Sequence, residues 1–127
     1  MAATGAVIGI GADLVDVDRF RLALARTPRL AERLFTDAER ADADRRRDPV
    51  EPLAARFAAK EAVMKALQVG LGSFPLRDVE VVRAPSGAPS LRLHRQAAAL
   101  AERAGVGAWH LTLTHTSHLA QAVAVAL

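Results

Sequence analysis

The sequence of 127 residues contains no cysteine, no tyrosine and a single tryptophan. The absence of cysteine excludes a disulfide scaffold, a thiolate zinc site and a cysteine nucleophile. Five aromatic residues offer little surface on which single-stranded nucleic acid could stack. No apolar run reaches the length of a membrane span, and aspartates interrupt the N-terminal apolar stretch, unlike in a signal peptide. These absences favour a cytoplasmic protein that binds neither nucleic acid nor a membrane.

The composition is that of one folded domain spanning residues 1–127. Hydrophobic residues make up 51% of the chain, which argues against disorder, and the length suffices for a core. The formal net charge is +3, and 15 of the 17 basic residues are arginine. Because the planar guanidinium suits phosphate and carboxylate groups, the chemistry favours an acidic protein or a phosphorylated small molecule as a partner.

The segment 53–67 predicts a central helix, since it is rich in helix formers, lacks glycine and follows Pro52. Its larger apolar residues fall at helical spacing and predict one apolar stripe: Leu53, Phe57, Met64 and Leu67. Glu61 falls on that stripe, where a carboxylate is costly to bury unless a metal ion or Lys65 compensates its charge. The alternative is an ordinary solvated face with a weak ion pair.

Residues 7–17 alternate as expected for a strand. One face carries Ile8, Ile10, Ala12 and Leu14; the other carries Gly9, Gly11, Asp13 and Val15. Because glycine has no side chain, a ligand or another backbone can approach this second face closely. We therefore expect Asp13 to face open space, although it could instead end the strand and cap the next element.

The remaining segments predict an α+β fold with a mainly antiparallel sheet and packed helices. Helices are expected at 20–25, from Thr27-Pro28, at a capping box formed by residues 36–39, and at 96–104 before Gly105. A charged, mobile loop is expected at 42–52. Strands are expected at 79–82 and 90–93 around a turn at 85–89, and at 109–115 and 119–127.

Three segments together carry a family resemblance: residues 8–15, residues 56–62 with Lys65, and residues 113–116. In this order they resemble the holo-[acyl-carrier-protein] synthase family, the small 4′-phosphopantetheinyl transferases, over about residues 7 to 125. The pairing of G-x-G-x-D with AAKEA is specific, whereas neither motif would be alone. The chain departs from the family where Gln68-Val69-Gly70 stands in place of Gly-Thr-Gly.

The resemblance implies an activity. The phosphopantetheine arm of coenzyme A would be transferred to a serine of an apo acyl carrier protein in fatty acid biosynthesis, releasing adenosine 3′,5′-bisphosphate. It further implies the 4′-phosphopantetheinyl transferase-like fold and a homotrimer with active sites at the subunit interfaces. Relatives that serve polyketide or peptide carriers are often about twice this length.

The resemblance also assigns roles to particular residues. Asp13 and Glu61 would bind Mg²⁺, and together with Lys65 they would be catalytic. Coenzyme A would be bound by Lys60, Lys65, Arg56, Gly70 and His115. The carrier protein would dock on Arg19, Arg26 and Arg29. Glu61 is the expected general base, with His115 as the alternative, and the run 45–47 could touch the 3′-phosphate, touch the carrier or merely be solvated.

A non-catalytic basic module that binds an acidic protein or RNA is the competing hypothesis. It accounts for the arginines but leaves Asp13 and Glu61 without a role.

Overall fold

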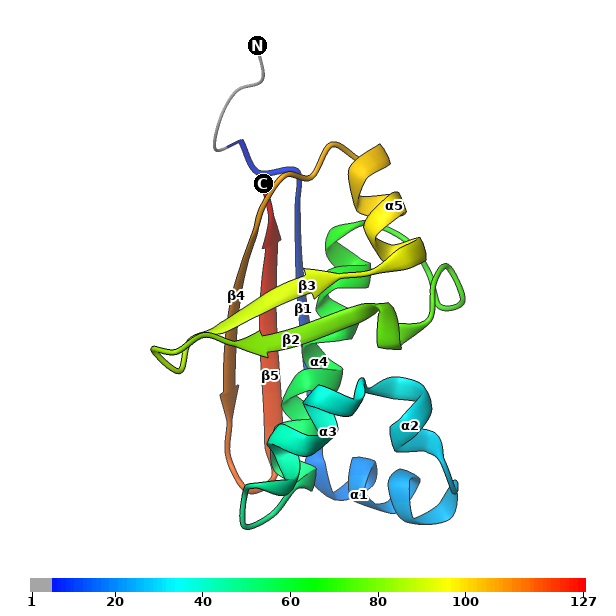
Figure 1. The fold of residues 1–127 in the computed structure, drawn as a ribbon, viewed down its shortest axis with the longest axis vertical. Helices are drawn as coiled ribbons and strands as arrows, with labels where there is room; N and C mark the ends of the chain where they lie inside the picture. The colour runs from blue at the N-terminus through cyan, green and yellow to red at the C-terminus, as the bar shows by residue number, and fades with distance from the viewer. Residues whose placement is uncertain (1–5) are drawn as a thin grey trace.

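The computed structural model describes residues 6–127, in which five strands form two antiparallel sheets around a central helix (Figure 1). Strands β1 (Gly9–Asp16), β5 (Leu119–Ala126) and β4 (Trp109–His115) form one sheet in the order β1-β5-β4. Strands β2 (Val79–Arg83) and β3 (Pro89–Leu93) form a separate hairpin. The prediction of an α+β fold with mainly antiparallel strands is confirmed, with the strands divided between two sheets.

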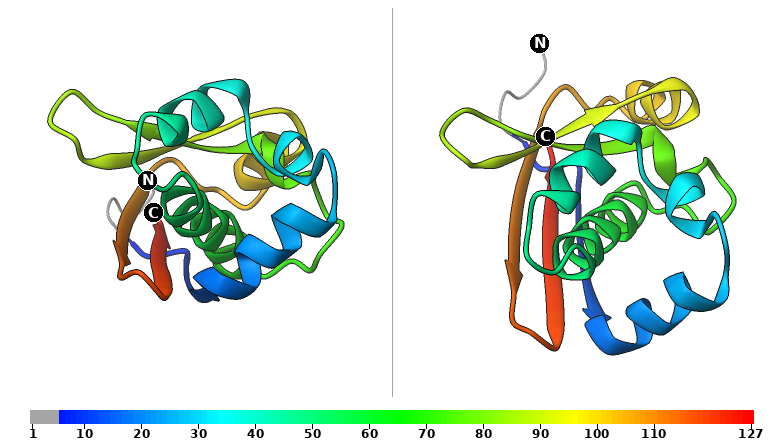
Figure 2. Two further views of the ribbon diagram at one scale, coloured as in Figure 1. Left: turned by 90° about the horizontal axis from the view of Figure 1, so that it is seen from below. Right: turned by 60° about the horizontal axis from the view of Figure 1, so that its bottom comes forward.

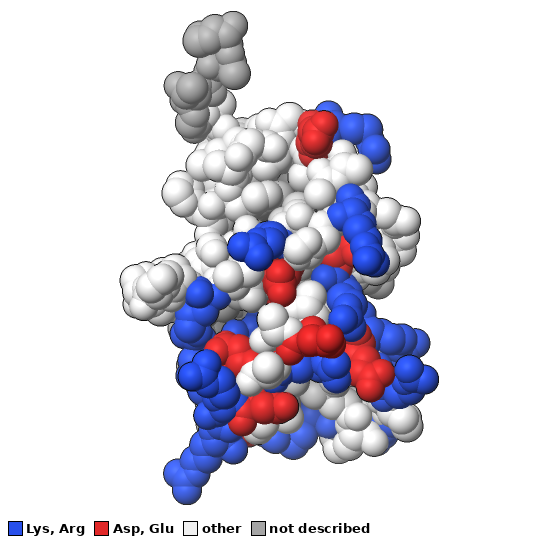
Figure 3. All heavy atoms as spheres, in the orientation of Figure 1, with Lys and Arg blue, Asp and Glu red and all other residues white. Residues whose placement is uncertain are grey.

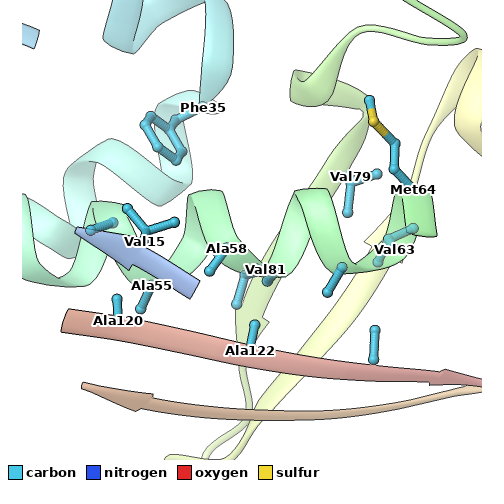
Figure 4. Close-up of a cluster of buried hydrophobic side chains, with 14 of the residues drawn as sticks. Val15, Phe35, Ala55, Ala58, Val63, Met64, Val79, Val81, Ala120 and Ala122 are labelled. Atoms are coloured by element: carbon cyan, nitrogen blue, oxygen red, sulfur yellow. The ribbon is translucent and has the colours of Figure 1, made fainter. Parts of the chain in front are cut away.

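The central helix α4 (Val50–Ala66) lies between the two sheets, as the view from below shows (Figure 2). Its alanines are the reason it fits there: Ala58, Ala59 and Ala62 are completely buried. Figure 4 shows this alanine-rich helix packed between Ala120 and Ala122 of β5 and the valines of β2. Small side chains let both layers approach the helix, so it is buried on most of its circumference.

Apart from Phe57, the predicted apolar stripe on this helix is buried, but it is only part of the buried surface, because the alanines on the other faces are buried as well. After the first turn of α4, the accessible strip consists of Phe57, Glu61 and Lys65, which follow one another at intervals of four residues. Phe57 and Glu61 are half-buried and Lys65 is exposed. Glu61 thus lies at the edge of the core, because the alanines as well as the larger apolar residues define the buried faces.

Helix α1 (Val17–Arg26) begins directly after β1, where Asp16 caps it by accepting the Arg19 N–H at 3.0 Å. The next helix, α2 (Leu30–Leu34), does not start at Thr27-Pro28 as predicted. Thr27 instead closes α1, and α2 is preceded by Arg29 in the left-handed conformation with φ 70°. The connection between the two helices therefore spans residues 27–29, and the second helix starts two residues later than the proline signal indicated.

Helix α3 (Asp37–Asp44) carries the predicted capping box between Thr36 and Glu39. Because α3 extends to Asp44 and α4 begins at Val50, only residues 45–49 remain of the expected loop 42–52. A short 3₁₀ turn η1 (Leu76–Asp78) precedes β2, and helix α5 (Arg95–Arg103) ends before Gly105 at φ 83°.

Lys60 is a core residue, which contradicts its predicted contact with coenzyme A. Its side chain is completely buried, and its ammonium donates to Glu39 Oε1 at 2.8 Å, to the Leu76 carbonyl at 3.2 Å and to the Val79 carbonyl. An ammonium has three N–H donors, so all of them are used. Burial lowers the pKa of Lys60, and the carboxylate of Glu39 opposes that effect.

On the face of the three-stranded sheet that points away from α4, the part formed by β1 and β5 is largely apolar and is uncovered in the described chain, whereas β4 presents polar residues there. Ile10 and Leu14 of β1 are 66% and 61% exposed, and Leu119 of β5 is 45% exposed. Among residues 6–127 no helix is long and apolar enough to cross a membrane. Exposed apolar patches of this kind usually mark a surface that another molecule covers.

Candidate active site

Asp13 and Glu61 come together because β1 lies directly against the backbone of α4. A Cβ atom at either Gly9 or Gly11 would lie 1.9 Å from a carbonyl oxygen of the helix, closer than real Cβ atoms ever approach. The glycine face of β1 therefore receives another backbone, one of the two predicted alternatives. Asp13 follows Gly11 on the same face, and Glu61 precedes Ala62, the residue that Gly11 contacts.

The two carboxylates interact electrostatically. Burial raises the pKa of Glu61 above its usual range, and the negative charge of Asp13 raises it further, while Lys65 lowers it. Two neighbouring carboxylates at the edge of a core are stabilised by a proton or a cation between them.

Lys65 supplies the nearest positive charge. Its ammonium donates to Asp13 Oδ1 at 3.0 Å and to the Ala12 carbonyl at 3.0 Å. The Lys65 side chain is 55% exposed, whereas that of Asp13 is only 18% exposed. A long, exposed side chain on a rigid helix can swing toward a ligand while its carboxylate partner stays in place.

An open groove of about 530 Å³ begins at this carboxylate pair and runs between β1, α1, α2 and α4. Its walls are mostly apolar, and Phe20 of α1 stacks on Phe57 of α4 with 5.1 Å between ring centroids. Arg19 is the basic residue among the groove's lining residues. A groove with charged groups at one end and an apolar floor suits a partner that combines a polar reacting group with an apolar contact.

The oxygen donors at this site suit Mg²⁺. Magnesium in enzymes is usually bound by one or two carboxylates, with waters and substrate phosphates completing the octahedron. Asp13 and Glu61 supply two carboxylates, and no group of three or more His, Cys, Asp or Glu side chains that could hold a metal exists within residues 6–127. The half-buried pair fits a cation whose remaining ligands come from outside the chain.

Arg56 lies in a different part of the molecule from the carboxylate pair. Its guanidinium is 4% exposed and forms an ion pair with Asp42 of α3, in a hollow of about 230 Å³ that Arg83 and Arg92 also line. Its Nε atom is buried and has no hydrogen-bond partner among residues 6–127. Within one chain, Arg56 does not meet Asp13 or Glu61.

His115 lies at the end of β4 and points toward α4, as the strand alternation predicted. Its Nδ1 is 3.4 Å from Glu51 Oε1 at the start of that helix, and the two line a hollow of about 240 Å³ with Arg46 and Arg47. Glu51 and Glu61 are ten residues apart, about 15 Å along a helix axis. One chain therefore does not bring His115 to the carboxylate pair.

The predicted docking arginines lie on the groove side of the chain. Arg19 lines the groove, and Arg26 is exposed in the last turn of α1. Arg29 is also exposed, and its Nε donates to Glu32 at 3.1 Å. Gly70 is exposed beyond the end of α4, and an added Cβ there would meet no atom within 4 Å.

Sequence reasoning missed the groove itself. The sequence pattern assigns Phe57 only to an apolar stripe. In the structure Phe57 lines the groove together with Leu30 and Leu34. Their shared position depends on how α2 turns back toward α4, which no local pattern encodes. Glu51, the partner of His115, was likewise assigned to a loop.

Comparison with known proteins gives a consistent family match. The family model described as the 4′-phosphopantetheinyl transferase superfamily matches residues 9–124. A holo-[acyl-carrier-protein] synthase of Frankia alni is 52% identical over 121 residues, covering 95% of this chain and 98% of that protein. One of Streptomyces avermitilis is 47% identical over 120 residues, covering 94% of this chain and 97% of that protein.

Solved structures agree with these matches. The holo-[acyl-carrier-protein] synthase of Neisseria meningitidis superposes with a TM-score of 0.86 at 29% identity, covering 96% of this chain and 99% of that one. The Helicobacter pylori synthase in complex with coenzyme A superposes with a TM-score of 0.82 at 28% identity. The match covers 93% of this chain and 99% of that one.

The electrostatics of the pair predict how the pKa of Glu61 responds to its neighbours. Replacing Asp13 with Asn should lower that pKa, because it removes a negative charge. Replacing Lys65 with Met should raise it, because it removes a positive one. Carboxyl ¹³C chemical shifts followed by NMR against pH, without divalent metal, measure both changes.

Asp37 is the internal reference, since Arg40 and Arg77 hold its pKa below the usual range and neither substitution touches them. The folded state holds the Glu61 proton more tightly than the unfolded chain. Stability contributed by this group is therefore present at low pH and is lost as the pH rises through the Glu61 pKa. An unchanged Glu61 pKa in the Asp13 variant would contradict the coupling.

Proposed function

The chain belongs to the 4′-phosphopantetheinyl transferase superfamily, and from that premise we propose a Mg²⁺-dependent holo-acyl-carrier-protein synthase. It transfers the 4′-phosphopantetheine group of coenzyme A to a serine of apo acyl carrier protein in fatty acid synthesis. The observation that carries the proposal is the half-buried Asp13–Glu61 pair beside Lys65, at the end of an apolar groove. The proposed location is the cytoplasm.

In the proposed reaction the serine Oγ of the carrier attacks the phosphorus that bears the pantetheine arm. The bond from that phosphorus to the bridging pyrophosphate oxygen breaks, and adenosine 3′,5′-bisphosphate leaves. Mg²⁺ held by Asp13 and Glu61 would neutralise charge on the pyrophosphate. Lys65 releases Asp13 and donates to the phosphate oxygens, which its exposed stem allows.

The serine proton passes to Glu61, directly or through a water. Glu61 suits this role by position, since it lines the groove through which the serine would approach. His115 remains the alternative base only if another copy of the chain supplies it, because within one chain it pairs with Glu51.

The carrier protein is proposed to dock along α1. Charged side chains gather over the α1–α3 end of the molecule, while much of the opposite end is uncharged (Figure 3). Arg19 stands beside the groove, and Arg26 and Arg29 continue the basic surface away from it. An acidic helix of the carrier laid on these arginines would bring its serine to the carboxylate pair and an apolar side chain into the groove.

A homotrimer with active sites at its subunit interfaces would join the two separated halves of the site. Asp13, Glu61 and Lys65 lie toward one end of α4, and Arg46, Arg47 and His115 toward the other. A second copy could place its basic hollow opposite the first copy's carboxylates, so that one coenzyme A touches both. The uncovered apolar face of β1 and β5 is available for such an assembly.

The competing binding module would use the same arginines without chemistry. It leaves a costly carboxylate pair at the edge of the core unexplained.

Carrier proteins of polyketide or peptide synthesis are a further possible substrate. Mass spectrometry of each apo carrier after incubation with coenzyme A and this chain distinguishes them by which carrier is modified.

Incubation of an apo acyl carrier protein with coenzyme A, Mg²⁺ and this chain should give a mass gain equal to phosphopantetheine. Glu61→Gln should lower kcat by at least about 100-fold, because it removes a carboxylate from the charge-compensated site. Glu102→Gln, an exposed change on α5, is the matched control and should leave the rate unaltered. No mass gain with any carrier would favour the binding module.

Arg19→Glu should raise the KM for the carrier about tenfold and leave coenzyme A binding unchanged, because it reverses one charge on the docking surface. Steady-state kinetics with each substrate varied in turn measures both values. Arg103→Glu on α5 makes the same charge change far from the groove and should have no effect. An equal loss of affinity for coenzyme A would rule out the docking role.

Ile10→Arg should dissociate the proposed trimer and abolish transfer, since it places a charge in the uncovered apolar face. Sedimentation velocity should show three times the mass of the chain for the native protein and a single chain for the variant. Leu71→Arg, at a position 79% exposed beyond α4, is the control and should remain assembled. A native protein that sediments as a monomer would refute the assembly.

A further inference from the structure

We propose that Gly11 is a positioning residue that sets the gap between Asp13 and Glu61 and so determines which divalent cation the pair accepts. The inference deepens the proposed function, since it concerns the size selectivity of the same metal site. It rests on backbone packing, which is independent of any bound ion.

Gly11 is pressed against the backbone of α4. A Cβ atom at this position would lie 1.9 Å from the Ala62 carbonyl oxygen, 2.8 Å from the Ala66 nitrogen and 2.9 Å from the Ala62 carbonyl carbon. All three are atoms of a hydrogen-bonded helix, so no flexible side chain can move aside. An alanine here must push strand and helix apart by about 1.5 Å to bring its Cβ from 1.9 Å to an ordinary contact of 3.4 Å with that oxygen.

The contact lies next to the carboxylate pair. Gly11 is two residues from Asp13, about 7 Å along a strand, and its contact Ala62 directly follows Glu61. Separation of β1 from α4 at this point therefore widens the distance that a shared cation must bridge. Phe57 and the core limit how far the half-buried Glu61 can follow.

The width of the gap between Asp13 and Glu61 decides which ion size the site prefers. Mg²⁺ needs near-ideal octahedral geometry with oxygens at about 2.0–2.1 Å, whereas Ca²⁺ tolerates irregular geometry at about 2.3–2.6 Å. A site held tight by backbone contact favours the smaller ion, and a site wedged open favours the larger one. Gly11 thus acts on the metal through β1 and α4 without touching it.

Gly9 provides a matched control within the same strand. Its Cβ would lie 1.9 Å from the Ala66 carbonyl oxygen, an equally severe backbone contact. It is four residues from Asp13, about 13 Å along the strand, and its contact lies more than one helical turn beyond Glu61. Gly9→Ala should therefore cost similar stability while leaving the gap at the carboxylates nearly unchanged.

The test is calorimetric titration of the native protein and each variant, all saturated with coenzyme A, with Mg²⁺ and Ca²⁺ separately. Circular dichroism and Tm are the controls of folding. Gly11→Ala should weaken Mg²⁺ binding about 10- to 100-fold and Ca²⁺ binding much less. Gly9→Ala should change neither affinity by more than about threefold. Native Mg²⁺ affinity in Gly11→Ala, or equal losses in both glycine variants, would overturn the proposal.

Should Gly11→Ala fail to fold, Glu61→Asp opens the gap from the other side by removing one methylene. It should also weaken Mg²⁺ binding more than Ca²⁺ binding, and equal weakening of both ions would overturn the inference. A native protein that binds neither ion in the presence of coenzyme A would instead refute the metal assignment in the proposed function. The two failures are thus distinguished by the native titration alone.

Discussion

The backbone contact between β1 and α4 is the constraint on which the rest of this structure depends. Gly9 and Gly11 allow carbonyl oxygens of the helix to approach the strand at distances that no side chain permits. The alanines of α4 extend the same close packing to β5 and β2 (Figure 4). A tightly held helix can keep a strained carboxylate pair at its edge, because neither element can relax to separate the charges.

Two neighbouring residues of this helix show how position decides the role of a charge. Lys60 is directed into the core, where Glu39 and two carbonyls use all its donors and join α3 and α4 to the start of β2. Glu61, one residue later, is directed toward the groove with its charge only partly compensated by Lys65. A rotation of 100° per residue thus separates a lysine paired in the core from a glutamate at the edge of the groove.

The single chain presents the proposed machinery in two separated parts. The carboxylate pair and the groove stand near one end of α4, and the hollow with His115 stands near the other. The outer face of β1 and β5 is largely apolar where a lone domain would be expected to be polar. Both features have one explanation if copies of the chain assemble through that face and share each site.

The sequence by itself determined the elements and the identity of the carboxylate pair. Alternation in β1, the capping box of α3 and the two motifs containing Asp13 and Glu61 are local patterns, which the chain carries whatever its tertiary contacts. Tertiary structure decided which charges face solvent. Lys60 became a core residue and the groove arose from α1, α2 and α4 together. Those outcomes depend on which surfaces the alanine-rich helix buries. The charged residues of α4 are spread around its circumference, so the helix has no amphipathic pattern that predicts its buried faces.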